Sequence, residues 1–224
     1  MALSIIVPML NEAAVLPALL SHLGHWRARG CEVLLVDGGS TDGSADMARA
    51  AGFMVVESER GRARQMDAGA AKAGGELLLF LHADTRLPAD ADAAVGAALA
   101  NPGRAWGRFD VHISGRAPML RVVATLMNLR SRLTGIATGD QAMFVRREAF
   151  DAVGGFPLQP LMEDIELSRR LLRRARPVCL RLRVATSGRR WEQRGVWRTI
   201  VLMWRLRWAY WRGVPAEALA QAYR

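Results

Sequence analysis

Short apolar runs alternate with segments of helical period through the first 85 residues, and no other feature restricts the fold of this chain so strongly. The apolar runs lie at residues 3–9, 33–36, 54–57 and 77–81, and the helical segments lie at 12–28, 44–51 and 63–72. Strands that alternate with helices form βαβ units in a parallel sheet covered on both faces. The sequence therefore predicts an α/β fold with a mostly parallel central sheet flanked by helices, Rossmann-like in this first half.

The pattern is less regular after Asp84. We expect helices at 89–99, 119–133 and 163–174, strands at 107–113, 141–145 and 178–184, and a short helix that ends at Gly154 and Gly155. The sequence contains neither an internal repeat nor a linker long enough to separate two domains. For 224 residues we therefore expect a single domain, with a regular nucleotide-binding half and a less regular substrate half.

The charge balance restricts the partners. The 31 basic and 21 acidic residues give a net charge of +10, which favours nucleic acid, a phosphorylated small molecule or an acidic membrane surface. Because no nucleic-acid recognition motif is visible, we expect no nucleic acid. Cys31 and Cys179 form no CxxC pair, which argues against a disulfide scaffold or a zinc site. The first residues read as a strand and no apolar stretch reaches about 18 residues, so we expect a cytoplasmic protein.

Polar residues follow the predicted strands where ligands of open parallel sheets bind, outside the carboxyl ends. Asp84 follows a very apolar run, so its carboxylate should face this crevice and could hold Mg²⁺ or Mn²⁺ with diphosphate oxygens. His82 lies on the same side of the strand, and is either a second metal ligand or a hydrogen-bonded core histidine. Asp37 could bind a ribose or base, or could belong to a plain turn in which Thr41 or Asp42 caps the next helix.

Seven segments carry a resemblance to a known family. In order they are Ile6-Val7-Pro8 with Asn11-Glu12, residues 36–43, residues 61–69, Leu81-His82-Ala83-Asp84, residues 139–147, Val153-Gly154-Gly155-Phe156, and residues 162–167. Together they resemble the family 2 glycosyltransferases of the GT-A fold, especially a compact bacterial subgroup. The resemblance implies a single, inverting, metal-dependent transfer of a sugar from a nucleoside-diphosphate donor to an acceptor hydroxyl. It also implies a GT-A domain over residues 1–190, with a nucleotide-sugar half at 1–100 and an acceptor half at 101–190.

The resemblance assigns several residues to the donor. It implies that Pro8, Glu12, Asp37 and Gly39 line the nucleoside pocket, and that Asp84 holds a divalent cation, Mn²⁺ or Mg²⁺, against the diphosphate. His82 stands where the family's DxD motif often has its first aspartate, and we include it as a second metal candidate. An aspartate at position 37 is compatible with UDP and with GDP donors.

Two arginines and an aspartate follow the third strand. Arg62 and Arg64 enter a helix, where guanidinium groups and free backbone N–H groups could meet the diphosphate. The alternative is that both are solvated surface charges. Asp67 occupies a position where the family often has Asn, and it would hydrogen-bond either the neighbouring loop or the base.

Asp164 matches the catalytic base of the family, with Glu163 orienting it or binding the acceptor. An inverting transfer needs such a group to take the proton of the acceptor hydroxyl. The alternative for both acids is capping, because carboxylates at a helix N-terminus complement the helix dipole. The resemblance places Gly139, Asp140 and Trp191 in the acceptor site, and the acceptor itself could be lipid-linked.

Residues 191–224 form a basic tail rich in tryptophan. In a helix, Trp197, Val201, Trp204, Trp208 and Trp211 make one continuous stripe, beside which Arg198, Arg205 and Arg212 recur every seven residues. A basic helix with an indole stripe can lie in an anionic membrane interface, which would place the protein on the inner face of the cell membrane. The alternatives are that the stripe packs in the core or against a partner subunit.

Other functions remain open. A sugar nucleotidyltransferase would have a glycine-rich basic loop after the first strand, where this chain has Pro8-Met9-Leu10-Asn11-Glu12. A noncatalytic module that binds nucleotide sugars or anionic lipids is the main alternative to a transferase.

Overall fold

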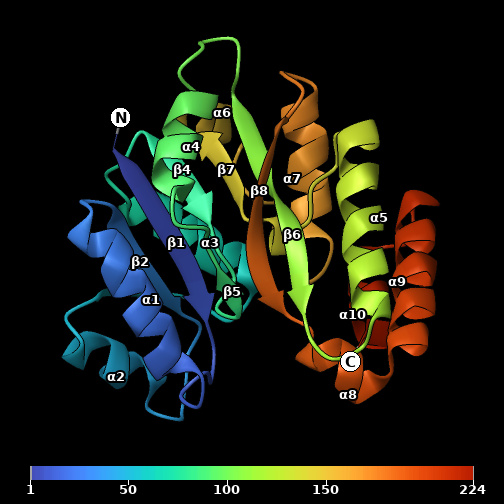
Figure 1. Ribbon diagram of the computed structural model, residues 1–224, viewed down its shortest axis with the longest axis horizontal. Helices are drawn as coiled ribbons and strands as arrows, with labels where there is room; N and C mark the ends of the chain where they lie inside the picture. Colours follow the sequence, from blue (N-terminus) through green and yellow to red (C-terminus); the bar gives the residue numbers. More distant parts are fainter. Residues whose placement is uncertain (1, 224) are drawn as a thin grey trace.

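The computed structural model describes residues 2–223 and contains one eight-stranded sheet, in the order β3-β2-β1-β4-β7-β6-β8-β5 (Figure 1). The strands are β1 (Leu3–Met9), β2 (Glu32–Asp37), β3 (Met54–Glu57), β4 (Leu77–Phe80), β5 (Thr85–Arg86), β6 (Trp106–Ser114), β7 (Met143–Arg146) and β8 (Val178–Ser187). Strands β1 to β4 are mutually parallel, as are β6 and β8, whereas β7 is antiparallel to β4 and β6 and β5 is antiparallel to β8. The predicted α/β fold with a mostly parallel sheet is confirmed.

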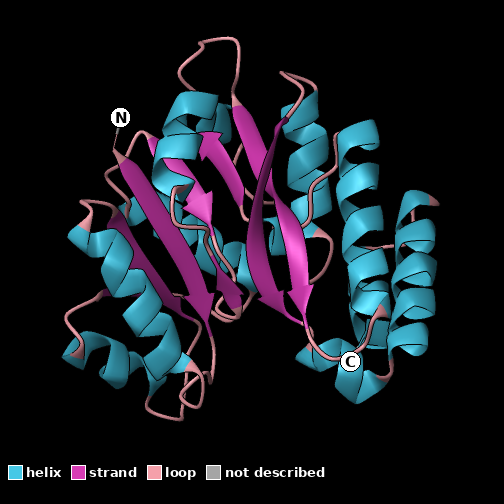
Figure 2. Ribbon diagram, in the orientation of Figure 1, coloured by secondary structure: helices cyan, strands magenta, loops and turns pink. Residues whose placement is uncertain are grey.

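Helices cover both faces of the sheet (Figure 2). The helices are α1 (Leu16–Ala28), α2 (Ser44–Ala50), α3 (Arg62–Lys72), α4 (Ala91–Ala98), α5 (Met119–Thr134), α6 (Arg147–Ala152), α7 (Glu163–Leu172), α8 (Arg189–Arg194), α9 (Val196–Trp211) and α10 (Ala216–Tyr223). Successive strand residues point to opposite faces. Accordingly Ile5 packs in one core cluster with α1, α4 and α5, and Ile6 packs in the other with α3, α6 and α7.

The register of the first strands brings their carboxyl ends to one edge of the sheet. Met9 of β1 lies opposite Asp37 of β2, and Ile6 of β1 lies opposite Phe80 of β4. The short 3₁₀ helix η1 (Gly139–Gln141) precedes β7. Because β7 runs antiparallel to β4, its amino end meets the carboxyl end of β4, so Gly139 and Asp140 arrive beside the residues that follow β4.

The last helices extend the domain beyond the sheet. Leu206 of α9 and Leu219 of α10 form a third, smaller apolar cluster with Met162 and Ile165 at the start of α7. The outward stripe of α9 is exposed, with Trp204 at 70% and Trp211 at 71%. The α9 stripe is therefore not packed in the core of this chain, which excludes the alternative of a core position and leaves that of a partner subunit. Among residues 2–223, no helix has the length and apolar character needed to cross a membrane.

Several elements differ from the sequence prediction. The first helix begins at Leu16, because residues 11–13 are hydrogen-bonded to the loop after β2 and Pro17 suits the first helical turn. The two-residue strand β5 and the helix α8 had no signal that we recognised, and the tail at 191–224, for which we expect a basic amphipathic helix, contains two separate helices after α8, namely α9 and α10. The predicted strand 178–184 continues to Ser187, because it pairs with β6 through Ser114.

Candidate functional site

The loops after β1 and β2 are joined by side-chain hydrogen bonds. The N–H of Asn11 donates to Ser40 Oγ, and the N–H of Thr41 donates back to Asn11 Oδ1, each at 2.9 Å. The N–H groups of Glu12 and Ala13 donate to Ser44 Oγ and Asp42 Oδ2, also at 2.9 Å. Asn11 adopts a left-handed conformation with φ of 54°, which asparagine tolerates. These bonds fix the position of Glu12 at the edge of the sheet.

Asp37 is buried and folds back on its own turn. Its Oδ2 accepts hydrogen bonds from the N–H groups of Gly39 and Ser40, at 3.1 and 3.0 Å, and its Oδ1 accepts one from Ser40 Oγ at 2.5 Å. The carboxylate thus shapes the loop in which Gly39 adopts a positive φ of 89°. Asp42, not Asp37, accepts the hydrogen bonds from the N–H and hydroxyl of Ser44 at the start of α2.

Sequence reasoning missed Gln65. Its buried amide Nε2 donates to the carbonyl oxygens of Met9 and Val36, both at 2.8 Å, and so joins the ends of β1 and β2 from α3. A Cβ on Gly38 would come within 3.0 Å of this amide, so the glycine after Asp37 leaves room for it. A polar residue on the apolar face of α3, in the order Ala63, Gln65, Met66, was the available signal.

Glu12 and Asp84 come together at this edge, although they follow different strands. Burial and then the negative charge of Asp84 raise the pKa of Glu12, while Arg189 and Arg190 act in the opposite direction. Asp84 is exposed, and its Oδ1 accepts long hydrogen bonds from Thr85 Oγ1 at 3.3 Å and from Thr186 Oγ1 at 3.5 Å. The sequence predicted the two acids at this edge of the sheet.

His82 lies against the segment that precedes β7. Its Nδ1 is 3.3 Å from Asp140 Oδ1, and a Cβ on Gly139 would come within 2.3 Å of its Nε2. Burial raises the pKa of Asp140, but the hydrogen bond and charge of His82, followed by Arg62 and Arg190, outweigh it and leave that pKa lowered. Both ring nitrogens of His82 thus face the 139–140 segment.

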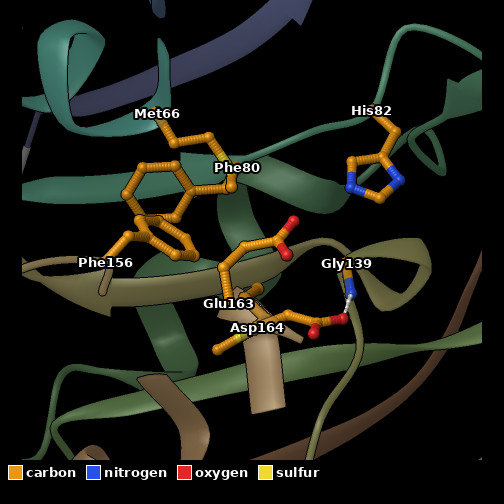
Figure 3. Close-up of a pocket in the computed structure, with 8 residues that line it drawn as sticks. Met66, Phe80, His82, Gly139, Phe156, Glu163 and Asp164 are labelled. Atoms are coloured by element: carbon orange, nitrogen blue, oxygen red, sulfur yellow. Dashed lines mark hydrogen bonds between the residues drawn. The ribbon is translucent and has the colours of Figure 1, made fainter. Parts of the chain in front are cut away.

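Asp164 and Glu163 line a small cavity with His82 and Gly139, next to the apolar side chains of Phe80 and Phe156 (Figure 3). Asp164 Oδ2 accepts a hydrogen bond from the N–H of Gly139, and Oδ1 accepts one from its neighbour Ile165, each at 2.7 Å. Burial, followed by the charge of Glu163, raises the pKa of Asp164 to about 6. The carboxyl therefore holds a proton more readily than an ordinary aspartate does.

Arg62 reaches the same carboxylates from the start of α3. Its Nη1 is 3.4 Å from Glu163 Oε1, and Glu163 is almost fully buried. Burial lowers the pKa of Arg62, but the charges of Glu163, Asp140 and Asp164 outweigh it and leave that pKa raised. The Arg62 side chain as a whole is 46% exposed, so part of it can also contact a ligand.

The other predicted residues have different contacts. Arg64 forms an ion pair with Glu59 and is half-exposed. Asp67 accepts a hydrogen bond from the N–H of Phe156 at 2.9 Å, and burial raises its pKa to about 6. Pro8 lies in β1 opposite Val36, and Trp191 of α8 packs against the main core cluster. Asp67 thus binds the neighbouring loop, which is one of its two predicted roles.

The acids at the strand ends are compatible with a hard divalent cation. Among the described residues, no group of three or more His, Cys, Asp and Glu side chains is arranged to hold a metal by itself. Asp84 and Glu12 nevertheless follow neighbouring strands, and the charge of Asp84 acts on Glu12, while Mg²⁺ or Mn²⁺ commonly completes its shell with phosphate oxygens and water. The residues therefore fit a cation that binds together with a diphosphate.

The comparison with known families identifies the class to which this fold and these strand-end acids belong. The model of glycosyl transferase family 2 matches residues 4–154, so the chain belongs to that family. A PGL/p-HBAD biosynthesis glycosyltransferase of Mycobacterium tuberculosis is 41% identical over 91 residues, which are 38% of this chain and 36% of the relative. An undecaprenyl-phosphate 4-deoxy-4-formamido-L-arabinose transferase of Aeromonas hydrophila is 33% identical over 96 residues, which are 38% of this chain and 29% of the relative. The matches thus span about a third of the length of these curated relatives.

Solved structures share the fold. The mannosyltransferase PcManGT from Pyrobaculum calidifontis, in complex with GDP-Man and Mn²⁺, superposes with a TM-score of 0.69 at 24% identity, covering 92% of this chain and 60% of that one. Residues 1–349 of S. aureus TarS in complex with UDP-GlcNAc give a TM-score of 0.64 at 19% identity, covering 84% of this chain and 58% of that one. The predicted GT-A-type fold and family are therefore confirmed.

Proposed function

We propose that this chain transfers a glycosyl group once, with inversion, from a nucleoside-diphosphate sugar to an acceptor hydroxyl. The observation that carries the proposal is the placement of Asp164, which combines a raised pKa with hydrogen bonds from Gly139 and Ile165. Capping of α7 alone does not account for the bond from Gly139, which comes from another element.

In this proposal Asp164 is the catalytic base. It takes the proton of the acceptor hydroxyl while the hydroxyl oxygen attacks the anomeric carbon and the bond from that carbon to the diphosphate oxygen breaks. A pKa of about 6 leaves the carboxylate mostly ionised at neutral pH, yet basic enough to accept the proton. Gly139 and Asp140 would then border the acceptor, and Glu163 would hold Arg62 in place.

The donor would lie along the ends of β1, β2 and β4. The loop of Asp37 and Gly39 would shape the nucleoside pocket, and Arg62, with Arg189 and Arg190, would surround the diphosphate. Asp84 and Glu12 would hold a Mn²⁺ or Mg²⁺ ion, which neutralises charge on the leaving diphosphate when it is bound. A role of His82 as a metal ligand stays a prediction. The contacts of the His82 ring favour a role in positioning Asp140. The GDP-Man and UDP-GlcNAc complexes of the structural neighbours support this class of donor.

A membrane-surface site of action is part of the same proposal. The exposed tryptophan stripe of α9 supports it, as does the name of one relative, an undecaprenyl-phosphate transferase. A lipid-linked acceptor follows as the expected substrate class.

The decisive experiment separates donor binding from turnover. Thermal shifts with a panel of UDP- and GDP-sugars, with and without Mn²⁺, would first identify the donor, because a ligand that binds the native state raises its melting temperature. Asp164→Asn should then bind this donor almost as the parent chain does, while kcat falls at least about 10²-fold.

Glu166→Gln is the matched control, because it removes one carboxylate from the same helix at a residue that pairs with Arg169 and Arg170. It should leave kcat within a factor of about two. Equal loss of donor affinity and turnover in Asp164→Asn would remove that residue from the role of base. Donor binding without any turnover in the parent chain would favour the noncatalytic module.

A further inference from the structure

Helix α5 carries an exposed apolar stripe of its own. Its members are Val122, Leu126, Leu129 and Leu133, and the members of the α9 stripe are Trp197, Val201, Trp204, Trp208 and Trp211. These nine side chains are between 48% and 71% exposed. Most of the large apolar side chains that are exposed among the described residues therefore lie on two helices. In an ordinary soluble protein, exposed apolar side chains are scattered singly over the surface.

In the view of Figure 1, α5 and α9 are neighbours at the same end of the molecule and run in the same direction. Helix α5 follows the end of β6, and α9 follows α8 after the end of β8, which is parallel to β6. Val196 and Ile200 of α9 pack against the same core cluster that contains Val123 of α5. The side of α9 with Val196 and Ile200 therefore packs towards the same core as the side of α5 with Val123.

The helical period then decides where the two stripes point. Successive residues of a helix are about 100° apart around its axis. The α5 stripe is therefore rotated by roughly a quarter turn from the side that carries Val123. The α9 stripe is rotated by roughly a quarter turn from the side that carries Ile200, but in the opposite rotational sense. In two parallel helices that face each other, opposite senses place both stripes on the same side. The buried residues, Leu120 on α5 and Leu206 on α9, lie across each helix from its stripe.

The charge of this surface selects its partner. Neither α5 nor α9 contains an acidic residue, and the exposed arginines at its borders are Arg121, Arg198, Arg205 and Arg212. A second copy of the chain would bring the same positive charges together, whereas anionic headgroups would neutralise them. Indole rings are favoured at headgroup depth, and aliphatic side chains are favoured slightly deeper.

We propose that α5 and α9 together form one docking surface for an anionic lipid bilayer. This extends the membrane contact of the proposed function from one helix to two and gives the domain a fixed orientation on the membrane. The binding step needs no donor, cation or turnover, so it can be tested apart from the transferase activity. Asp164→Asn should bind vesicles as the parent chain does.

The test is cosedimentation of the full chain with vesicles of phosphatidylglycerol and phosphatidylcholine, compared with vesicles of phosphatidylcholine alone. Leu126→Glu on α5 and Trp204→Glu on α9 should each weaken binding to the anionic vesicles at least about tenfold. Met54→Glu is the matched control, because Met54 is 53% exposed like Leu126 but lies on β3 at the far edge of the sheet. Leu126→Ser removes the apolar group without adding a negative charge and should also weaken binding.

Two results would overturn the proposal. In the first, Leu126→Glu and Leu126→Ser bind anionic vesicles as tightly as Met54→Glu, which would leave α5 outside the surface. In the second, light scattering finds a dimer that Leu126→Glu and Trp204→Glu convert to monomers, which would make the surface a contact between copies. Circular dichroism of each variant separates loss of binding from loss of folding.

Discussion

Replacing Asp164 with asparagine should stabilise the fold at alkaline pH while it removes the proposed base. The pKa of Asp164 is about 6 in the folded chain, against an ordinary 3.8. The folded state therefore holds the proton more tightly than the unfolded state does. The fold loses stability as pH rises through the window between these two values, and the loss is complete above the folded pKa.

The shift in the pKa of Asp164 sets the size of the expected change in stability. Roughly two pKa units correspond to about 3 kcal/mol at pH 8, and at pH 5 only about half of this cost is present. Asparagine avoids the cost, but it has one acceptor oxygen where Asp164 uses two, for Gly139 and Ile165, and the lost hydrogen bond costs about 1 kcal/mol. The expected gain at pH 8 is about 1–2 kcal/mol, and at about 2–4 °C per kcal/mol it is measurable for a chain of this size.

Thermal and urea unfolding at pH 5 and pH 8 would measure the difference. The gain in Asp164→Asn should be larger at pH 8, and Glu166→Gln, which makes the same change in net charge on the same helix, is the control for the loss of a carboxylate. A destabilisation of Asp164→Asn that is equal at both pH values would refute the assignment of a raised pKa to this carboxyl.

Two further predictions concern the same site. Because protonated Asp164 cannot accept a proton, kcat should fall about tenfold per pH unit below about pH 6, and a rate that stays constant well below that pH would contradict the prediction. Gly139→Ala would place a Cβ within 2.3 Å of His82 Nε2 and should lower kcat at least about tenfold, whereas Gly96→Ala, whose Cβ meets no atom within 4 Å, should leave kcat unchanged. Steady-state kinetics of the two variants would decide, and equal rates would show that the 139–140 segment can move freely.

Local pattern was sufficient for the first half of the fold and for its acids. The strands at 3–9 and 54–57 were predicted with the observed limits, because short apolar runs between segments of helical period depend little on distant contacts. The positions of Glu12, Asp37 and Asp84 followed from the rule that strand ends meet at one edge of a parallel sheet. Each of these residues is close in sequence to a strand that the hydrophobic pattern identifies.

The second half of the site depends on contacts that periodicity does not encode. Asp164 meets Gly139 because β7 enters the sheet antiparallel to β4, and the strand at 141–145 carried no sign of its direction. Arg189 and Arg190 act on Glu12 from a helix that the sequence did not indicate. Gln65 joins two strand ends from a helix that the sequence did indicate, but its amide had no motif to mark it.

The tryptophan stripe shows how periodicity and burial answer different questions. A step of three and four residues places the indoles on one side of α9, but a core-facing helix and a membrane-facing helix have the same period. The deciding fact is that Leu206, on the opposite side, fills the contact with Met162 and Ile165. Since the other side of α9 meets the protein, its indoles face outward and are free for the proposed membrane contact, and the arginines beside them favour an anionic surface.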